Sequence, residues 1–302
     1  MGKKGKKALA GKPKKPTPKD IGKRLDVLVK NLEEELKDVD LFAPLPPAED
    51  CAICLVPLPR KQIRETWYKA CCGNFICWAC YMENKESINK QNEEKTGKKV
   101  ALTCPFCREP EPTSNDGELA RLQARCLQGD HNACFILGDF YQDGVNETPK
   151  DGLKALDCHI WAIELGSPEA CLAIANRCDK GDGVAVDKER AALFTKVGAL
   201  RGDVLARHNI GLSEYFDHDN YETAIRHWMI AAEAGLQRPL NVLRNIYEAD
   251  GKMPGKEFIS KEYLDFAYRA CHKAQMEVKS EEREKHLDMG LPMHLDPKSS
   301  DK

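Results

Sequence analysis

The 302-residue chain has no long apolar run. Its longest uninterrupted apolar stretches, such as Trp228–Ala232, contain only a handful of residues, whereas a membrane-spanning helix needs about 18 or more. The N-terminus carries lysines but no apolar stretch of the kind that a secretory signal requires. We therefore expect an intracellular protein, cytoplasmic or nuclear, with no membrane partner.

The signatures of several enzyme classes are also missing. No Ser-His-Asp order, no glycine-rich phosphate loop and no spacing of paired carboxylates stands out, which argues against a hydrolase or a kinase. The first 130 residues contain no histidine, since His131 is the first in the chain. A metal site in that part of the chain therefore has no histidine ligand, and other side chains such as cysteine must supply all of its ligands.

Charge is distributed unevenly along the chain. Residues 1–24 contain ten Lys/Arg and one acid, so the other 278 residues carry a net charge of −11 within a total of −2. Residues 1–20 offer almost nothing to bury and are predicted to form a disordered basic tail. A solubilising arm is favoured over a nuclear-import patch. A nucleic-acid contact is least favoured and would be a non-specific, salt-sensitive contact with a polyanion.

Residues 21–47 read as an amphipathic helix followed by a proline-rich linker. The apolar residues fall in helical phase and form one stripe. They are Leu25, Leu28, Val29, Leu32 and Leu36. A helix packed on the next domain is favoured over a dimerising or partner-binding helix, since the stripe is short for an independent coiled coil.

Small residues recur at a fixed separation in the second half of the chain. Gly129, Gly166 and Gly202 lie 37 and 36 residues apart, and an alanine follows each of them four residues later. A period in the mid-thirties with two helices per unit predicts an α-solenoid over residues 118–278. The predicted helix pairs are 131–142 with 152–165, 168–178 with 188–200, 204–215 with 220–234, and 237–248 with 259–277.

The phase of this repeat resembles that of Sel1-like (TPR-like) repeats. The matching residues are Ala133, Leu137, Gly138 and Tyr141 in the first unit, and Gly181, Gly183, Val184, Asp187, Arg190 and Ala191 in the loop and second helix of the next. The third unit lacks the loop glycines. The resemblance implies an all-α solenoid that binds a protein substrate or an adaptor, and residues 279–302 remain as a charged C-terminal tail.

Eight of the 14 cysteines lie between Cys51 and Cys107, and we name residues 51–108 the cysteine block. They come as four pairs: Cys51 and Cys54, Cys71 and Cys72, Cys77 and Cys80, and Cys104 and Cys107. In a reducing compartment such density indicates metal rather than disulfides. Eight thiolates suffice for two tetrahedral Zn²⁺ sites, and a two-residue spacer lets one turn offer two sulfurs to one ion.

The order of these pairs resembles a RING finger, with residues 48–110 as the domain. That resemblance implies a cross-brace, in which Cys51, Cys54, Cys77 and Cys80 share one structural zinc and Cys71, Cys72, Cys104 and Cys107 share the other. Asn74 stands where the family usually has a histidine ligand, so Cys71 is the expected replacement. The combination with Sel1-like repeats is similar to RING/Sel1 proteins of unicellular algae over residues 46–274.

The RING resemblance further implies a ubiquitin ligase that recruits an E2 ubiquitin-conjugating enzyme. Ile53 and Pro105 correspond to contact positions for that enzyme, and Arg108 corresponds to an arginine that holds the charged thioester. No residue of the chain itself is expected to be a catalytic nucleophile. The alternative for the whole protein is a non-enzymatic zinc-binding scaffold for protein–protein interaction. The alternative for the residues beside the ligands is that Pro105 only shapes a zinc turn and Arg108 is a solvent-facing charge. Trp78 is interpreted equally well as a border of the partner groove or as packing.

Six cysteines occur singly in the second half. They are Cys126, Cys134, Cys158, Cys171, Cys178 and Cys271. Lone cysteines on amphipathic helices are expected to pack as small apolar residues rather than to act as ligands or nucleophiles. His208 and His227 are likewise expected to be structural.

Overall fold

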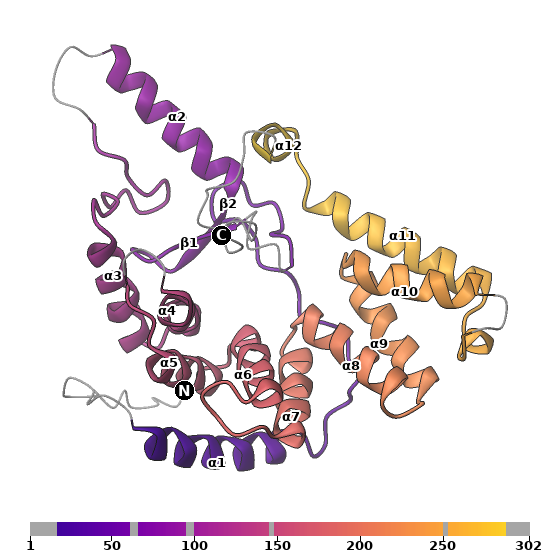
Figure 1. Cartoon of the computed structure of the whole chain (residues 1–302). Helices are drawn as coiled ribbons and strands as arrows, with labels where there is room; N and C mark the ends of the chain where they lie inside the picture. The colour runs from indigo at the N-terminus through magenta and orange to yellow at the C-terminus, as the bar shows by residue number, and fades with distance from the viewer. Residues whose placement is uncertain (1–16, 61–65, 95–99, 145–147, 250–252, 288–302) are drawn as a thin grey trace, which may run out of the picture.

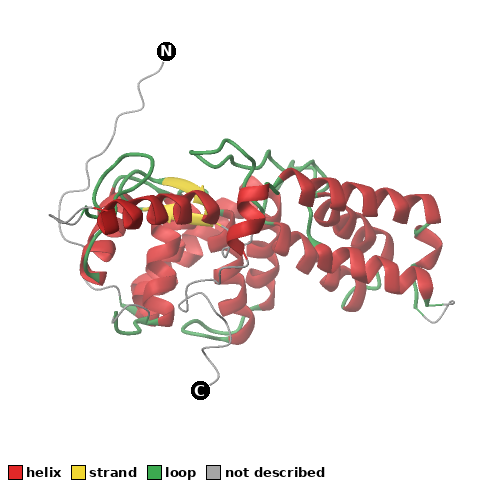
Figure 2. Cartoon of the chain, turned by 90° about the horizontal axis from the view of Figure 1, so that it is seen from above, coloured by secondary structure: helices red, strands yellow, loops and turns green. Residues whose placement is uncertain are grey.

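The computed structural model describes residues 17–60, 66–94, 100–144, 148–249 and 253–287. Helices dominate this part of the chain, and the two short strands are the exception (Figures 1 and 2). The elements are α1 (Pro18–Glu35), β1 (Thr66–Lys69), β2 (Asn74–Cys77), α2 (Trp78–Glu94), α3 (Asn115–Leu127), α4 (His131–Asp143), α5 (Gly152–Glu164), α6 (Pro168–Lys180), α7 (Lys188–Leu200), α8 (Val204–Phe216), α9 (Tyr221–Glu233), α10 (Gln237–Glu248), the 3-10 helix η1 (Lys256–Phe258), α11 (Lys261–Glu277) and α12 (Glu281–Leu287). No helix in these described ranges is long and apolar enough to cross a membrane.

Helices α4 to α11 form four antiparallel pairs, which we call the helix-pair array. The predicted helix bounds differ from the observed ones by two residues at most. Most of these helices begin at a side chain that caps the first turn, as Asp187 does by accepting from the amide of Arg190 at 2.9 Å. The periodic glycines precede the first helix of each pair and have positive φ, for example 103° at Gly166. That conformation is left-handed and is adopted by glycine without steric cost.

Close helix crossings explain why small residues recur at equivalent positions. Ala133, Ala170 and Ala206 are fully buried. A Cβ added to Gly211 on α8 would overlap the indole of Trp228 on α9, whose Nε1 donates to the carbonyl of His208 at 3.2 Å. The backbones of paired helices therefore approach closely, and aromatic side chains fill the wider gaps between them.

Helix α1 packs on the helix-pair array, along α5 and α7 (Figure 1). Ion pairs join the two surfaces, with Arg190 Nη2 at 2.7 Å from Asp26 and Arg201 Nη2 at 2.9 Å from Glu35. The buried stripe is Ile21, Leu25, Leu28 and Leu32. The apolar stripe of α1 therefore packs within the chain, as a packing helix does. It packs on the helix-pair array and not on the cysteine block that follows it in the sequence.

Helix α1 also starts earlier than predicted. Thr17 caps it in a reciprocal arrangement with Asp20, so residues 18–20 belong to the helix and not to a disordered tail. Residues 1–16, which contain the remainder of the predicted basic tail, lie outside the described residues.

Two further helices lie outside the predicted helix pairs. Helix α3 begins at Asn115, between the predicted RING domain (48–110) and the predicted solenoid (118–278), and packs on α4. Helix α12 falls in the predicted charged tail, whose residues 288–302 lie outside the described part.

The prediction for the lone cysteines is wrong for one pair. Cys126 on α3 and Cys134 on α4 form a disulfide, because the short connection between these helices brings the two residues together. Cys171, Cys178 and Cys271 are free and buried, as packing residues are. The histidines singled out with them, His208 and His227, are buried as well.

Candidate metal centre

The cysteine block is built on a hairpin and the helix that follows it. Strands β1 and β2 pair antiparallel. The turn between them carries Cys71 and Cys72, followed by Gly73 with a φ of 77°. Strand β2 ends at Cys77, and Cys80 lies in the first turn of α2. One continuous stretch of chain therefore presents two pairs of thiols at opposite ends of a short hairpin.

Two loops of the same backbone conformation supply the other thiols. The first cysteine loop, residues 50–57, and the second cysteine loop, residues 103–110, are each closed by an isolated β-bridge. In both, the amide of the residue after the second cysteine donates to the carbonyl of the first cysteine at 2.9 Å. That residue has a positive φ in both loops, 57° at Leu55 and 63° at Arg108.

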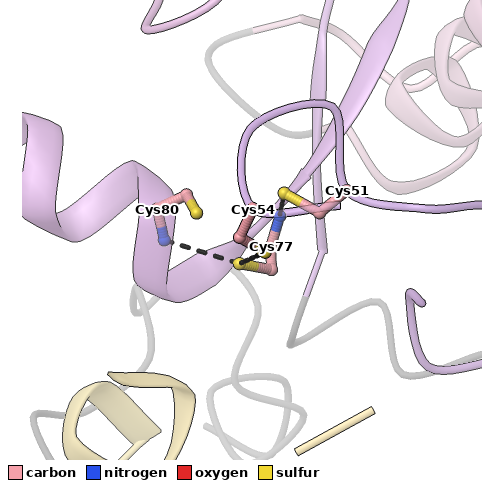
Figure 3. A group of neighbouring side chains, drawn as sticks. All are labelled: Cys51, Cys54, Cys77 and Cys80. Atoms are coloured by element: carbon pink, nitrogen blue, oxygen red, sulfur yellow. Dashed lines mark hydrogen bonds between the residues drawn. The ribbon is translucent and has the colours of Figure 1, made fainter. Parts of the chain in front are cut away.

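The fold gathers the eight sulfurs into two sets of four. Within each set, the ligand atoms all lie within 4.8 Å of one another. The sets are Cys51, Cys54, Cys77 and Cys80 (Figure 3), and Cys71, Cys72, Cys104 and Cys107. These are the two sets that the resemblance implied, with the first loop joining the end of the hairpin and the second loop joining its turn.

The distances within the sets suit a tetrahedral metal ion. Four sulfurs at about 2.3 Å from a central Zn²⁺ lie about 3.8 Å from one another. The sulfurs of Cys54 and Cys77 are 3.9 Å apart, as are those of Cys72 and Cys104. The donors are all soft sulfur atoms, which zinc and related metals prefer over carboxylate or carbonyl oxygen. Each set could therefore hold one ion.

Proximity also changes the acidity of the thiols. Hydrogen bonds from the neighbouring thiols of Cys77 and Cys80 lower the pKa of Cys51. The same contact with Cys51 raises the pKa of Cys77 to about 11, and that of Cys80 also rises. Protons therefore leave the set one at a time, since each new thiolate repels the next. A divalent cation offsets this repulsion because it attracts all four thiolates, and metal binding therefore releases the protons.

Cys71 is the residue at which the cysteine pattern differs from that of a usual RING finger. Its sulfur lies 3.4 Å from that of Cys107. Asn74, at the usual histidine position, lies on β2 opposite Lys69 in the hairpin register. The structure thus places Cys71 in the second set together with its neighbour Cys72.

An aromatic cluster supports the first set. The rings of Trp67 and Tyr81 stack in parallel planes with centroids 5.0 Å apart, and Trp78 packs on both at 5.7 and 5.3 Å. Trp78 is buried. Of the two interpretations of Trp78, packing is the one that the structure supports.

The residues expected to contact a partner lie on the two cysteine loops. Ile53 has 39% of its surface exposed, Pro105 is half-buried and Arg108 is exposed. Leu55 and Phe106, which were not predicted to contact a partner, are 73% and 50% exposed. Both lie directly beside a ligand cysteine in the sequence, so adjacency to the loop cysteines is the signal that would have found them.

Hydrogen bonds fix the hairpin to the start of the helix-pair array. The hydroxyl of Tyr68 on β1 donates to Asp130, the capping residue of α4, at 2.7 Å, and Arg125 Nε donates to the same carboxylate at 2.9 Å. Burial opposes the charge of Asp130, but these hydrogen bonds from Tyr68 and Arg125 prevail and lower its pKa. Beside them, Lys69 pairs with Glu111.

Comparison with known proteins finds likeness at the level of structure. No family model and no curated protein matches the chain. A Sel1 repeat protein from Oxalobacter formigenes is similar at 20% identity and a TM-score of 0.46, covering 61% of this chain and 51% of its own. The antigen c5321 of uropathogenic Escherichia coli, which displays an SLR fold, is 26% identical with a TM-score of 0.41, covering 51% and 33%. The chain thus spans about half, or less, of these proteins.

Proposed function

We propose that the chain is a zinc-dependent RING-type E3 ubiquitin ligase. The cysteine block recruits an E2 ubiquitin-conjugating enzyme charged with ubiquitin, and the helix-pair array binds the substrate or an adaptor. The observation that carries the proposal is the set of exposed side chains on the two cysteine loops. Ile53 and Leu55 on the first loop, with Phe106 and Arg108 on the second, offer an apolar contact surface and a cation.

Zinc is the metal that this donor set favours. Four thiolates with no exchangeable position make a closed site, which is typical of structural rather than catalytic zinc. We propose two such ions, one in each set of cysteines. Their part is to hold the two cysteine loops on the hairpin, so that the exposed side chains of the loops keep a fixed spacing.

Arg108 is the residue to which we assign the positioning of the charged enzyme. Its planar guanidinium carries five donors and can bond two acceptors at once. Bridging the conjugating enzyme and ubiquitin would restrict the mobile, thioester-linked ubiquitin. A substrate lysine amine then attacks the thioester carbonyl and the enzyme's cysteine thiolate leaves. Restricting the thioester raises the effective concentration of the reacting groups.

We assign the substrate or adaptor to the first helices of the pairs in the helix-pair array. Helix α1 covers α5 and α7, the second helices of their pairs. The half-buried residues Phe135, Leu172 and Asn209 occupy equivalent positions of α4, α6 and α8, at a spacing of 37 residues. A row of such positions on successive repeats suits an extended polypeptide, as in other helical repeat proteins.

Discharge of ubiquitin from a panel of charged conjugating enzymes tests the proposal. We expect wild-type protein to accelerate discharge to free lysine. Arg108→Ala and Ile53→Ala should lose this acceleration while retaining two zinc ions per chain. The matched controls are Arg244→Ala and Val186→Ala, which alter exposed side chains of the array.

One result would contradict the ligase, and another would contradict only the roles of two residues. One is a zinc-loaded protein that accelerates discharge from no enzyme of a broad panel, which would leave a zinc-binding interaction scaffold. The other is an active protein in which Arg108→Ala and Ile53→Ala have no effect, which would remove the roles assigned to these two residues.

A further inference from the structure

The last described helix returns to the cysteine block. Helix α12 lies against α2 (Figure 1), and its Arg283 is hydrogen-bonded to the first cysteine loop. It is seven residues long and highly charged, a composition that ordinarily faces solvent. One of its side chains does the opposite, because Arg283 is only 7% exposed.

The guanidinium of Arg283 is bonded to the first cysteine loop. Nη1 donates to the carbonyl of Pro57 at 2.7 Å and to that of Val278 at 2.6 Å. Nη2 donates to the carbonyl of Val56 at 3.0 Å and reaches the sulfur of Cys54 at 3.5 Å. The contacts with Val56, Pro57 and Cys54 join α12 to one side of the first set of cysteines.

A buried guanidinium needs an opposite charge near it. Carbonyl groups supply dipoles but no net charge, and burying an unpaired cation is costly. Once Cys54 is a thiolate, it faces Arg283 with a negative charge. Four thiolates around a divalent ion carry a net charge of −2, so a metal-loaded site attracts the cation.

Donors to metal-bound sulfur also stabilise the metal site. Backbone amides already donate to this set, from Cys77 to the sulfur of Cys51 at 3.3 Å and from Cys80 to that of Cys77 at 3.5 Å. Arg283 adds a charged donor to a third sulfur, that of Cys54. Removing such an outer-sphere partner typically lowers metal affinity by about 10- to 100-fold.

We infer that Arg283 is an outer-sphere partner of the first metal site and couples the docking of α12 to the metal ion in that site. The inference rests on metal binding by Cys51, Cys54, Cys77 and Cys80, and not on ligase activity. Coupling is reciprocal. The ion therefore strengthens the docking of α12, and the docked helix slows release of the ion.

Metal release measures one half of the coupling. The full chain is loaded with two zinc ions, and transfer to a chromogenic chelator is followed for the wild type, Arg283→Ala, Arg283→Lys and the control Lys285→Ala on the same helix. We expect Arg283→Ala to release one ion about tenfold faster. The other ion keeps its rate, since the second set lies elsewhere on the hairpin. Arg283→Lys should be intermediate, and Lys285→Ala should match the wild type.

Hydrogen exchange measures the other half of the coupling, which is the effect of the metal ion on the docking of α12. It uses the wild-type chain and so does not require that a variant folds. Amides of residues 281–287 and 55–58 of the wild type should be protected in the zinc-loaded chain and lose protection when a chelator removes the ions. Equal protection of residues 281–287 in both states would overturn the inference, as would unchanged release of both ions from Arg283→Ala. A chain that binds no ion through the first set would overturn it too. A chain that shows the coupling but discharges no ubiquitin would remove the ligase proposal alone.

Discussion

The hydroxyl of Tyr68 donates to the carboxylate of Asp130 across the boundary between the cysteine block and the helix-pair array, at 2.7 Å. The same carboxylate caps α4 through the amides of Asn132 and Ala133 and accepts from Arg125. One half-buried side chain thus caps the start of a helix and binds the hairpin to it. Loss of this hydrogen bond is therefore expected to weaken the attachment of the cysteine block to the helix-pair array.

Removing the Tyr68 hydroxyl should destabilise the protein. A hydrogen bond to a charged group contributes about 1.5–3 kcal/mol, so Tyr68→Phe is expected to lower the free energy of unfolding by that amount. Denaturant unfolding followed by circular dichroism measures it. Tyr268→Phe, on α11, is the matched control, and an equal effect of the two substitutions would contradict the role given to the bond.

The approach of α8 to α9 should make Gly211 intolerant of a methyl group. A Cβ there overlaps Trp228, so Gly211→Ala is expected to cost about 1–3 kcal/mol through overpacking. Gly152→Ala is the control, because a Cβ at Gly152 meets nothing within 4 Å and alanine favours a helix. Thermal unfolding compares the stabilities of the two variants. A Gly211→Ala protein as stable as Gly152→Ala would contradict the expected overlap with Trp228.

Acid should weaken the fold through His227. Burial lowers the pKa of His227 to about 4, and the nearby cation of Arg207 adds to this. A folded pKa below the unfolded value of 6.5 means that the unfolded chain binds a proton first as the pH falls. Stability is therefore lost between about pH 6.5 and 4, by up to about 3 kcal/mol.

Replacing His227 by an uncharged residue should flatten that dependence. His227→Gln is expected to show a smaller change in the free energy of unfolding between pH 7 and pH 4.5 than the wild type. His218→Gln alters an exposed histidine and serves as the control. Identical pH profiles of the wild type and His227→Gln would show that His227 does not cause the loss.

Metal removal should unfold the cysteine block and leave most of the array helical. Zinc binding contributes about 10–16 kcal/mol to the folding of zinc-finger peptides, and this block has a small core of its own. We expect a chelator to change the fluorescence of Trp67 and Trp78 while far-ultraviolet circular dichroism keeps most of its helical signal. Complete loss of helix on chelation would contradict this.

Cys71 should be required for one of the two ions. Cys71→Ser is expected to bind a second zinc ion more weakly, because the hydroxyl is a poor substitute for a thiolate. Cys158→Ser, a free cysteine of the array, should bind two ions like the wild type. Equal zinc content and affinity in both variants would exclude Cys71 as a ligand.

The helix pairs could be predicted because local signals mark their ends. Capping side chains, such as Asp187, precede the helices, and glycines with positive φ end or separate them. These signals act over a few residues and are visible in the sequence. The spacing of the eight cysteines is equally local, and the two sets of sulfurs could be named through the resemblance to a RING finger.

Long-range partners could not be predicted in the same way. The apolar stripe of α1 shows that one face is buried, but not that α5 and α7 cover it. The charged sequence of α12 gives no sign that Arg283 is buried. The carbonyls of Val56 and Pro57 that accept from it lie more than 200 positions earlier in the chain. The Cys126–Cys134 disulfide could not be predicted either, because it depends on how α3 packs against α4.

Attachment of the cysteine block at both ends of the array limits how the protein can evolve. An open repeat protein can gain or lose a repeat, because each unit contacts only its neighbours. Here Tyr68 fixes the block to α4, and Arg283 fixes it to the helix that follows α11. A duplicated or deleted repeat would move α12 away from the first cysteine loop. The number of repeats is therefore set by the span of the block, and variation among relatives of this chain should fall in loops rather than in repeat count.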